Sequence, residues 1–398
     1  MKVLHIVYQS LPNISGSSIR TRDIVMSQNE IGLNPFVLSS PFQNGISQAE
    51  IDTIHGVKHI RTYNNQPQFL VSETKTPLYK RIIKSFAIIS FYKKAKKVVK
   101  TEKPDVIHAH ATFFCAIVAI ALGKRFNIPV CYEVRSLWEE REKKSAVSFI
   151  ETIQPKIIYY LETKCMRNVE QVIVINENLK NDILSRSVRN IEVIPNAVNL
   201  NLLNKNRDLM KPRNELTFGY IGSVSPIEGL DLVVKVWSKL EKEGVKNKFH
   251  IFGNGSFLKE LKALTVSLGV NNIVFHGNID TNQIDQAFNM LDVIVNPRTK
   301  SRISDTVTPL KPLEAMAYKK LVIASDVGGM RELIKDNKTG VLFKSDSEQA
   351  LKETIINVIN TGANKDIIES AYRYVYTKKN WNNNADKYRL IYEKLLNN

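Results

Sequence analysis

The sequence predicts an α/β protein made of two Rossmann-like, doubly wound domains, each with a mostly parallel sheet. Short apolar, β-branched runs alternate with amphipathic stretches along the whole chain. A polar, turn-rich segment separates two halves of similar pattern, and small-residue loops follow the first strand of each half. Such sheets bind ligands beyond the carboxyl ends of their strands, so we expect a ligand site in a cleft between the domains.

The composition favours anionic partners and a reducing compartment. The formal charge of +17 suits nucleotides, nucleic acid or an anionic membrane surface. The three cysteines, Cys115, Cys131 and Cys165, are far apart among apolar residues, which argues against a disulfide framework or a CxxC metal site. The longest apolar run, 113–122, is too short to span a bilayer, and we see no signal peptide. We therefore expect a cytoplasmic protein.

The first domain is predicted over residues 1–198, with strands at 3–7, 106–110 and 130–134 among others. The polar residues 199–214 are predicted to be a linker, and 215–376 a second domain. We expect residues 377–398 to form a last helix that packs back toward the first domain, with Tyr388 and Tyr392 on its apolar face.

Several side chains follow strands of the first domain. Gly16 and Ser17 would let backbone amides approach a phosphate or sugar, although a glycine among serines is more often an ordinary turn. His110 could bond a sugar hydroxyl or handle a proton, or be structural. We expect His108 and His110 to point to opposite faces of their strand and so not to form a metal pair. The acceptor-side candidates are Glu133, Arg135 and Trp138; the two charges could instead pair with each other.

Residues 80–103 combine about nine cations with regularly spaced apolar residues. This pattern is typical of a basic amphipathic helix, which can lie on an anionic membrane surface. The alternative is a surface helix with a solvated lysine face.

The second domain brings cations to a strand–helix–strand unit at 293–332. The strand 293–296 leads into a loop that carries Arg298, Arg302 and Lys311. Thr308 is predicted to cap a helix whose first residue is Pro309. The free amides of residues 307–311 and the cations would then face one anionic ligand.

A set of motifs distributed along nearly the whole chain resembles the GT-B glycosyltransferases of family four. They are Ser15-Gly16-Ser17, DVIHAH at 105–110, IPNAV at 194–198, YIGSVSPIEGLD at 220–231, IFGNGS at 251–256 and KPLEAMAYKKLVIASDVGG at 311–329. The resemblance implies a retaining enzyme that transfers a sugar from a nucleotide-sugar, with a UDP-sugar favoured, to a glycan or lipid-linked acceptor in bacterial polysaccharide or glycolipid synthesis. It gives the first domain to the acceptor and the second to the donor.

The resemblance also implies that Glu314 binds the ribose. The full set of predicted donor-binding residues is Gly16, Ser17, Gly222, Ser223, Gly253, Asn254, Asp305, Thr306, Val307, Thr308, Leu310 and Glu314. The chain departs from the family pattern at three positions: Thr306, with Asp305 beside it, replaces a Glu, and Ser223 and Glu228 replace a phosphate-binding Arg and Lys. We therefore hypothesise that Arg298, Arg302 and Lys311 clamp the diphosphate, and that these three with His110 are the catalytic residues.

We expect no metal and no cofactor, because the sequence has no DxD triplet and no His/Asp cluster with metal-site spacing. The nucleotide-sugar is a substrate. Two other functions stay open: a sugar-nucleotide 2-epimerase of the same fold, and a catalytically inactive basic binding protein. Nucleic-acid binding is disfavoured because the aromatic residues are not interleaved with the cations. Attachment to the inner face of a membrane would come through residues 80–103.

Overall fold

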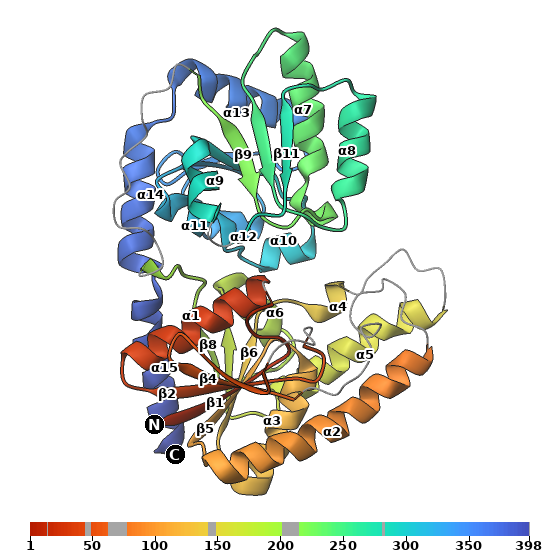
Figure 1. Ribbon diagram of the computed structural model, residues 1–398, viewed down its shortest axis with the longest axis vertical. Coiled ribbons are helices and arrows are strands. Elements are labelled where there is room, and N and C mark those ends of the chain that lie inside the picture. The colour runs from red at the N-terminus through yellow and green to blue at the C-terminus, as the bar shows by residue number, and fades with distance from the viewer. Residues whose placement is uncertain are drawn as a thin grey trace. The chain divides into compact units, whose positions relative to one another are not determined.

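The computed structural model describes residues 1–13, 15–43, 49–62, 78–141, 149–200, 215–280 and 283–397. These residues form two compact units (Figure 1). Unit 1 contains Met1–Pro195 and Trp381–Asn398, and unit 2 contains Asn196–Asn380. The first boundary lies three residues before the predicted one, and the last helix starts at Trp381 rather than 377. Most of the predicted linker lies outside the described residues.

Unit 1 holds an eight-stranded sheet with the order β3-β4-β2-β1-β5-β6-β7-β8. Every neighbouring pair is parallel except β3 with β4. The strands are β1 (Lys2–Val7), β2 (Asn34–Ser39), β3 (Ile51–Ile54), β4 (Val57–Arg61), β5 (Val106–His110), β6 (Val130–Val134), β7 (Gln171–Val174) and β8 (Ile191–Val193). Strands β1 and β5, neighbours in the middle of the sheet, are buried almost throughout, although β1 contains one histidine and β5 contains two.

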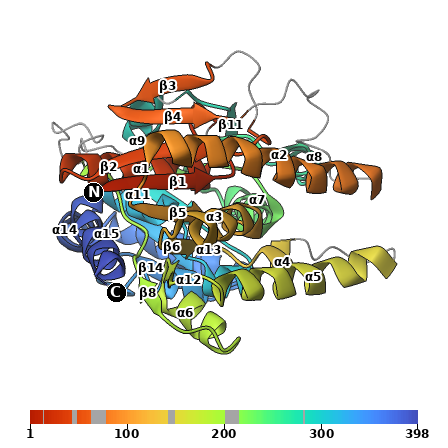
Figure 2. The same cartoon turned by 90° about the horizontal axis from the view of Figure 1, so that it is seen from below.

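Seven helices surround this sheet in the described part of unit 1. They are α1 (Gly16–Glu30), α2 (Leu78–Glu102), α3 (Phe113–Phe126), α4 (Trp138–Arg141), α5 (Phe149–Met166), α6 (Glu177–Leu184) and α15 (Trp381–Leu396). Helix α15 packs against α1, whereas α3 packs against α2 and α5; both views show these groupings (Figure 1, Figure 2). Ser15 starts α1 with a reciprocal capping box to Ser18, which fixes where the loop after β1 ends.

Unit 2 holds a six-stranded parallel sheet with the order β11-β10-β9-β12-β13-β14. Its strands are β9 (Phe218–Ile221), β10 (Phe249–Phe252), β11 (Ile273–Gly277), β12 (Val293–Asn296), β13 (Leu321–Ser325) and β14 (Val341–Phe343). Val293 and Val295 of β12 enter one hydrophobic cluster, and Ile294 enters another. Because side chains alternate along a strand, this split shows that both faces of the sheet are covered.

The helical segments described in unit 2 are η3 (Pro226–Glu228), α7 (Leu230–Lys242), α8 (Leu258–Ser267), α9 (Ile284–Met290), α10 (Arg302–Thr306), α11 (Lys311–Ala317), α12 (Gly328–Arg331), α13 (Glu348–Thr361) and α14 (Lys365–Lys378). One predicted start is wrong. Helix α11 begins at Lys311 with Pro312 in its first turn, so Thr308 is not its cap and Pro309 is not its first residue. Thr308 instead accepts hydrogen bonds from Asn196, and a separate short helix, α10, precedes it.

No helix among the described residues combines the length and apolar character that crossing a bilayer demands.

Candidate active site

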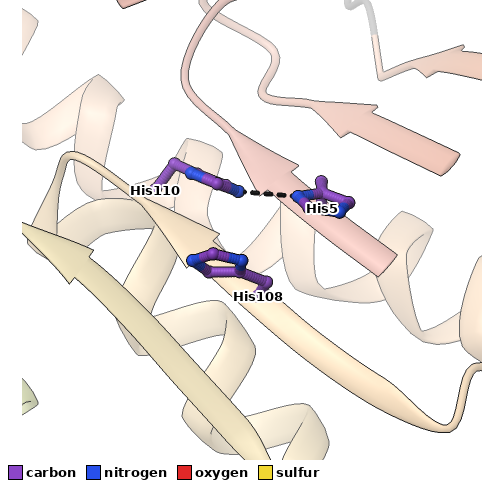
Figure 3. A group of neighbouring side chains, drawn as sticks. All are labelled: His5, His108 and His110. Atoms are coloured by element: carbon purple, nitrogen blue, oxygen red, sulfur yellow. Dashed lines mark hydrogen bonds between the residues drawn. The ribbon is translucent and has the colours of Figure 1, made fainter. Parts of the chain in front are cut away.

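Three buried histidines meet at the centre of the unit 1 sheet (Figure 3). His5 comes from β1, and His108 and His110 come from β5. The expectation that His108 and His110 point to opposite faces is wrong: their rings stack with centroids 4.0 Å apart. Residues two apart on a strand share a face, because the side-chain period is two. Strand pairing of β1 with β5 then brings His5 opposite His108.

The hydrogen bonds of this cluster fix which nitrogen of each ring carries the proton. Arg135 can only donate, and its Nη2 lies 2.5 Å from His110 Nδ1, so Nδ1 accepts. Neutral His110 therefore carries its proton on Nε2, 2.8 Å from His5 Nδ1. His5 in turn donates from Nε2 to Gln28 Oε1 at 2.9 Å. Burial, and then the charge of Arg135, lower the pKa of His110 to about 4, which keeps the ring neutral at pH 7.

The same direction of donation continues to the third histidine. Gln28 Nε2 donates to the Tyr392 hydroxyl at 3.0 Å, and that hydroxyl donates to His108 Nδ1 at 2.7 Å. His108 therefore carries its proton on Nε2, which has no hydrogen-bond partner. Glu133 Oε2 lies 3.7 Å away. Burial lowers the pKa of His108 well below its ordinary value.

This cluster is the one group of three described His, Cys, Asp or Glu side chains whose ligand atoms lie close enough to suggest a metal, all within 4.8 Å. Its hydrogen bonds disfavour that use. His5 Nδ1 and His110 Nε2 bond each other at 2.8 Å, and a metal between them would have to replace this bond. The rings stack rather than converge on one point. The expectation that the chain uses no metal stays a prediction.

Glu133, an acceptor-side candidate, is instead the buried anion of this network. Its side chain is 0% exposed, so it is not open to an acceptor in this structure. Oε1 accepts from Arg135 Nε at 2.6 Å and Arg20 Nε at 3.0 Å, and Oε2 accepts from the Tyr388 hydroxyl at 2.5 Å. Burial alone would raise the pKa of Glu133, but the two guanidinium groups hold it well below its usual range. The alternative that Glu133 pairs with Arg135 is confirmed.

Arg135 also holds the first turns of α1. Its Nη1 donates to the Ser17 carbonyl at 2.7 Å, to Ser17 Oγ at 3.0 Å and to Thr21 Oγ1 at 2.9 Å. Gly16 and Ser17 are exposed at the start of α1, as a ligand-binding loop requires. Trp138 donates from Nε1 to the Ala111 carbonyl. Ala111 has φ 68°, an uncommon conformation for a residue with a Cβ, directly after His110.

Both ring nitrogens of His110 therefore bond protein groups, and the side chain is 1% exposed. Its predicted contact with substrate stays a prediction.

In unit 2 the two predicted glycine loops meet at the carboxyl ends of β9 and β10. Gly222 donates from its amide to the Phe252 carbonyl at 2.9 Å, and both Gly222 and Gly253 have φ 144°. A Cβ on Gly253 would collide with the Gly222 backbone, and one on Gly222 would collide with the side chain of Lys311. Close approach of the backbone thus requires glycine at 253, whereas at 222 the positive φ favours it. Ser223 and Asn254 are exposed beside them.

Two of the three predicted clamp cations converge on Glu228. Lys311 Nζ lies 3.0 Å from Glu228 Oε2 and contacts the Tyr220 hydroxyl. Arg298 is buried, with Nε 3.9 Å from the same oxygen and Nη1 donating to the Val307 carbonyl at 3.2 Å. The third cation, Arg302, is exposed on α10 and is not among the described contacts of Glu228.

The remaining donor candidates lie between α10 and α11. Asp305 Oδ1 accepts from the Gly328 amide at 2.7 Å, and Thr306 Oγ1 donates to the Arg302 carbonyl at 2.6 Å. The Val307 amide bonds the Ile303 carbonyl at 2.8 Å, so it is not one of the free amides predicted for an anion. The buried Thr308 accepts from Asn196 Nδ2 at its carbonyl and its Oγ1.

Leu310 and Glu314 flank the start of α11 and are partly exposed. The roles predicted for these donor residues stay predictions.

The sequence reasoning missed His5, Arg20 and Gln28. A signal was present: His5 interrupts an otherwise apolar strand, and Arg20 and Gln28 lie about two turns apart on one helix. Their burial depends on α15, which supplies Tyr388 and Tyr392 from the far end of the chain.

Comparison with known proteins finds similarity to glycosyltransferases over both halves of the chain. The family model described as "Glycosyl transferases group 1" matches residues 204–381, and "Glycosyltransferase Family 4" matches residues 41–202. An uncharacterized glycosyltransferase of Methanocaldococcus jannaschii is 23% identical over 85% of this chain and 90% of its own length. The poly(ribitol-phosphate) alpha-N-acetylglucosaminyltransferase of Staphylococcus aureus is 26% identical over 48% of this chain and 37% of its own length.

Among solved structures, Anabaena HepE in complex with UDP-glucose superimposes with a TM-score of 0.74 at 17% identity, covering 99% of this chain and 100% of HepE. Two sheet-based α/β units and this likeness define a GT-B fold. The two family matches, which together span most of residues 41–381, make the chain an enzyme that transfers sugars. It belongs to the GT-B glycosyltransferases of family four.

Proposed function

We propose that the enzyme transfers a sugar from a UDP-sugar to a glycan or lipid-linked acceptor of a bacterial polysaccharide or glycolipid, with retention of the anomeric configuration. The observation that carries the donor proposal is the convergence of Lys311 and Arg298 beside Gly222, beyond the carboxyl ends of β9 and β12. That is where open parallel sheets bind their ligands. Two similar proteins support the substrate classes: the HepE structure is a complex with UDP-glucose, and the S. aureus relative is named for a ribitol-phosphate polymer.

The proposed chemistry is stabilisation of the leaving group. Breaking the bond from the anomeric carbon to the diphosphate places negative charge on the phosphate oxygens. Preorganised cations and donors lower that barrier, and one lost donor typically costs about 2.7 to 4 kcal/mol. Arg298 and Lys311 would supply this charge without a metal ion, with Arg302 as a third member of the clamp. Activity that persists after exhaustive EDTA treatment would support a metal-independent reaction, and full loss would contradict it.

The clamp is tested with Arg298→Ala, Arg302→Ala and Lys311→Met, each assayed for turnover and for UDP affinity. Loss of Arg298 or Lys311 is expected to lower kcat about 10²- to 10³-fold, because each contributes charge to the leaving group. Lys319→Met is a matched control, since Lys319 pairs with Glu369 through an ion pair of 3.1 Å outside this cluster. Unchanged turnover and affinity in the Arg298 and Lys311 variants would rule the clamp out.

The donor is identified by thermal unfolding with UDP, GDP and ADP and their sugars. A ligand at 100 times its Kd adds about 2.7 kcal/mol of stability, which is readily measured. Product analysis then decides the reaction: conversion of the sugar nucleotide alone, without an acceptor, would indicate an epimerase. NMR of the new glycosidic bond decides whether the configuration is retained.

The helix α2 offers a route to a membrane. Lys93, Lys97 and Lys100 are exposed along its described part, and Ile89 is 54% exposed one turn earlier. Lysines beside an exposed apolar side chain suit an anionic lipid surface. We propose that this helix holds the enzyme peripherally at the membrane that carries its acceptor.

A further inference from the structure

Glu228 is a buried carboxylate between the buried Arg298 and the partly exposed Lys311. It ends the short turn η3, directly before Gly229 and α7. Its Oε2 lies 3.0 Å from Lys311 Nζ and 3.9 Å from Arg298 Nε. Two positive charges thus share one negative charge in a place that water scarcely reaches.

The arrangement leaves hydrogen-bonding capacity unused. Glu228 Oε2 has the Lys311 ammonium at 3.0 Å, but Arg298 Nε, a buried donor, has no partner in hydrogen-bonding geometry. A buried polar atom without a partner costs about 1 to 3 kcal/mol, and more when it is charged. An anion with several oxygens would give Arg298 Nε an acceptor, because such a group can accept from the guanidinium and the ammonium together.

Glu228 and a bound diphosphate would compete for these same cations. Both are anions, and two like charges that share a cation pair oppose each other. A carboxylate fixed at this position therefore weakens the attraction of the cluster for phosphate while it satisfies the cations when no ligand is bound.

We infer that Glu228 is an internal counter-ion that competes with the donor's diphosphate for Lys311 and Arg298 and so loosens the hold of the enzyme on the nucleotide. This inference rests on the proposed function, which makes a nucleoside diphosphate the ligand of this cluster. A looser hold favours release of the nucleoside diphosphate after transfer. Glu228 is then a positioning residue that tunes affinity without touching the sugar.

The inference is tested with Glu228→Gln, which keeps the shape and removes the charge. Calorimetry with UDP, inorganic pyrophosphate and uridine measures each Kd. We expect Glu228→Gln to bind UDP and pyrophosphate about tenfold more tightly, a change of about 1.4 kcal/mol, and uridine unchanged. Glu369→Gln is the matched control, because it also removes one carboxylate that forms an ion pair with a lysine of unit 2, here Lys319, outside the cluster. It should leave all three Kd values unchanged.

A pH series gives a second readout that a purely structural role would not produce. Four groups face Lys311: Glu228 on η3, Arg298 after β12, Tyr220 on β9 and Glu314, which lies on the same helix α11. Burial lowers the pKa of Lys311, and Glu228 opposes that effect. Without the Glu228 charge Lys311 loses its proton at lower pH. The alkaline loss of pyrophosphate binding should therefore move to lower pH in Glu228→Gln.

If Glu228→Gln does not fold, Glu228→Met takes its place, because it also removes the charge and keeps an unbranched side chain of similar length, and it too should bind pyrophosphate about tenfold more tightly. Unchanged or weaker pyrophosphate binding in the folded variant, or an equal gain for uridine, would overturn the inference. If the wild type binds neither UDP nor pyrophosphate, the proposed donor falls and the inference with it; if it binds both and Glu228→Gln binds them equally, only the inference falls.

Discussion

The guanidinium of Arg135 donates to Nδ1 of His110 at 2.5 Å, and this one contact sets the proton positions of three buried histidines. Arginine has no acceptor, so donation runs in one direction from it through His5 and Gln28 to His108. The same guanidinium bonds the Ser17 carbonyl. Arg135 therefore couples the histidine cluster to the exposed first turn of α1.

Replacing Arg135 by Gln should raise the pKa of His110 from about 4 toward its ordinary value, because a neighbouring positive charge is lost while Glu133 stays. The histidine Cε1–H signals in an NMR titration report this directly. Arg135→Lys, which keeps the charge, should leave the pKa of His110 below that in Arg135→Gln. Equal pKa values in the two variants would show that burial alone keeps His110 neutral.

The buried histidines should make unit 1 sensitive to acid. The pKa of His108 is lowered in the fold, so between pH 6.5 and that lower pKa the unfolded chain binds a proton that the native one does not. Stability then falls as pH falls, by up to about 1.4 kcal/mol per pH unit for each such histidine. His108→Asn, whose Oδ1 can replace Nδ1 as the acceptor for Tyr392, should flatten this dependence by about that amount. Urea denaturation at a series of pH values measures both slopes, and parallel slopes would contradict the assignment.

Sequence reasoning located the strand ends and the glycine loops because their signals are local. A buried parallel strand is rich in apolar residues, and β9 and β10 are each followed directly by a glycine, whereas the small residues after β1 precede α1. The ion pair of Glu133 with Arg135 was also within reach, because the two residues are close in sequence.

Contacts between side chains on elements far apart in the sequence could not be predicted. Glu228 was recognised as a departure from the family pattern, but its pairing with Lys311 joins residues 83 positions apart. Tyr388 reaches Glu133 over 255 positions. No local pattern encodes such contacts, which depend on how helices dock on the sheet. The start of α11 was misplaced for a local reason: Thr308-Pro309 and Lys311-Pro312 offer competing start signals, and Thr308 is instead used by Asn196.

Gly253→Ala should destabilise unit 2 more than an ordinary glycine replacement. The new Cβ would meet the Gly222 backbone, and φ is 144°, so overpacking of about 1 to 3 kcal/mol adds to the backbone strain. Gly269→Ala is the control: Gly269 also has positive φ, 64°, but nothing lies within 4 Å of its added Cβ. The difference in unfolding free energy between the two variants isolates the collision. Equal losses of unfolding free energy in the two variants would mean that the loops at Gly222 and Gly253 move apart at no energetic cost.

Neutralising the exposed lysines of α2 should release the enzyme from anionic vesicles. Each basic residue near such a surface contributes about 1 kcal/mol, so Lys93→Gln, Lys97→Gln and Lys100→Gln together should weaken binding about a hundredfold. Lys242, Lys259 and Lys262 are exposed in unit 2, and their triple replacement by Gln changes the net charge equally. Co-sedimentation with vesicles of phosphatidylglycerol and phosphatidylcholine compares the two. A local membrane-binding face predicts loss only in the α2 variant, whereas equal loss in both would mean that the overall charge of +17 acts without such a face.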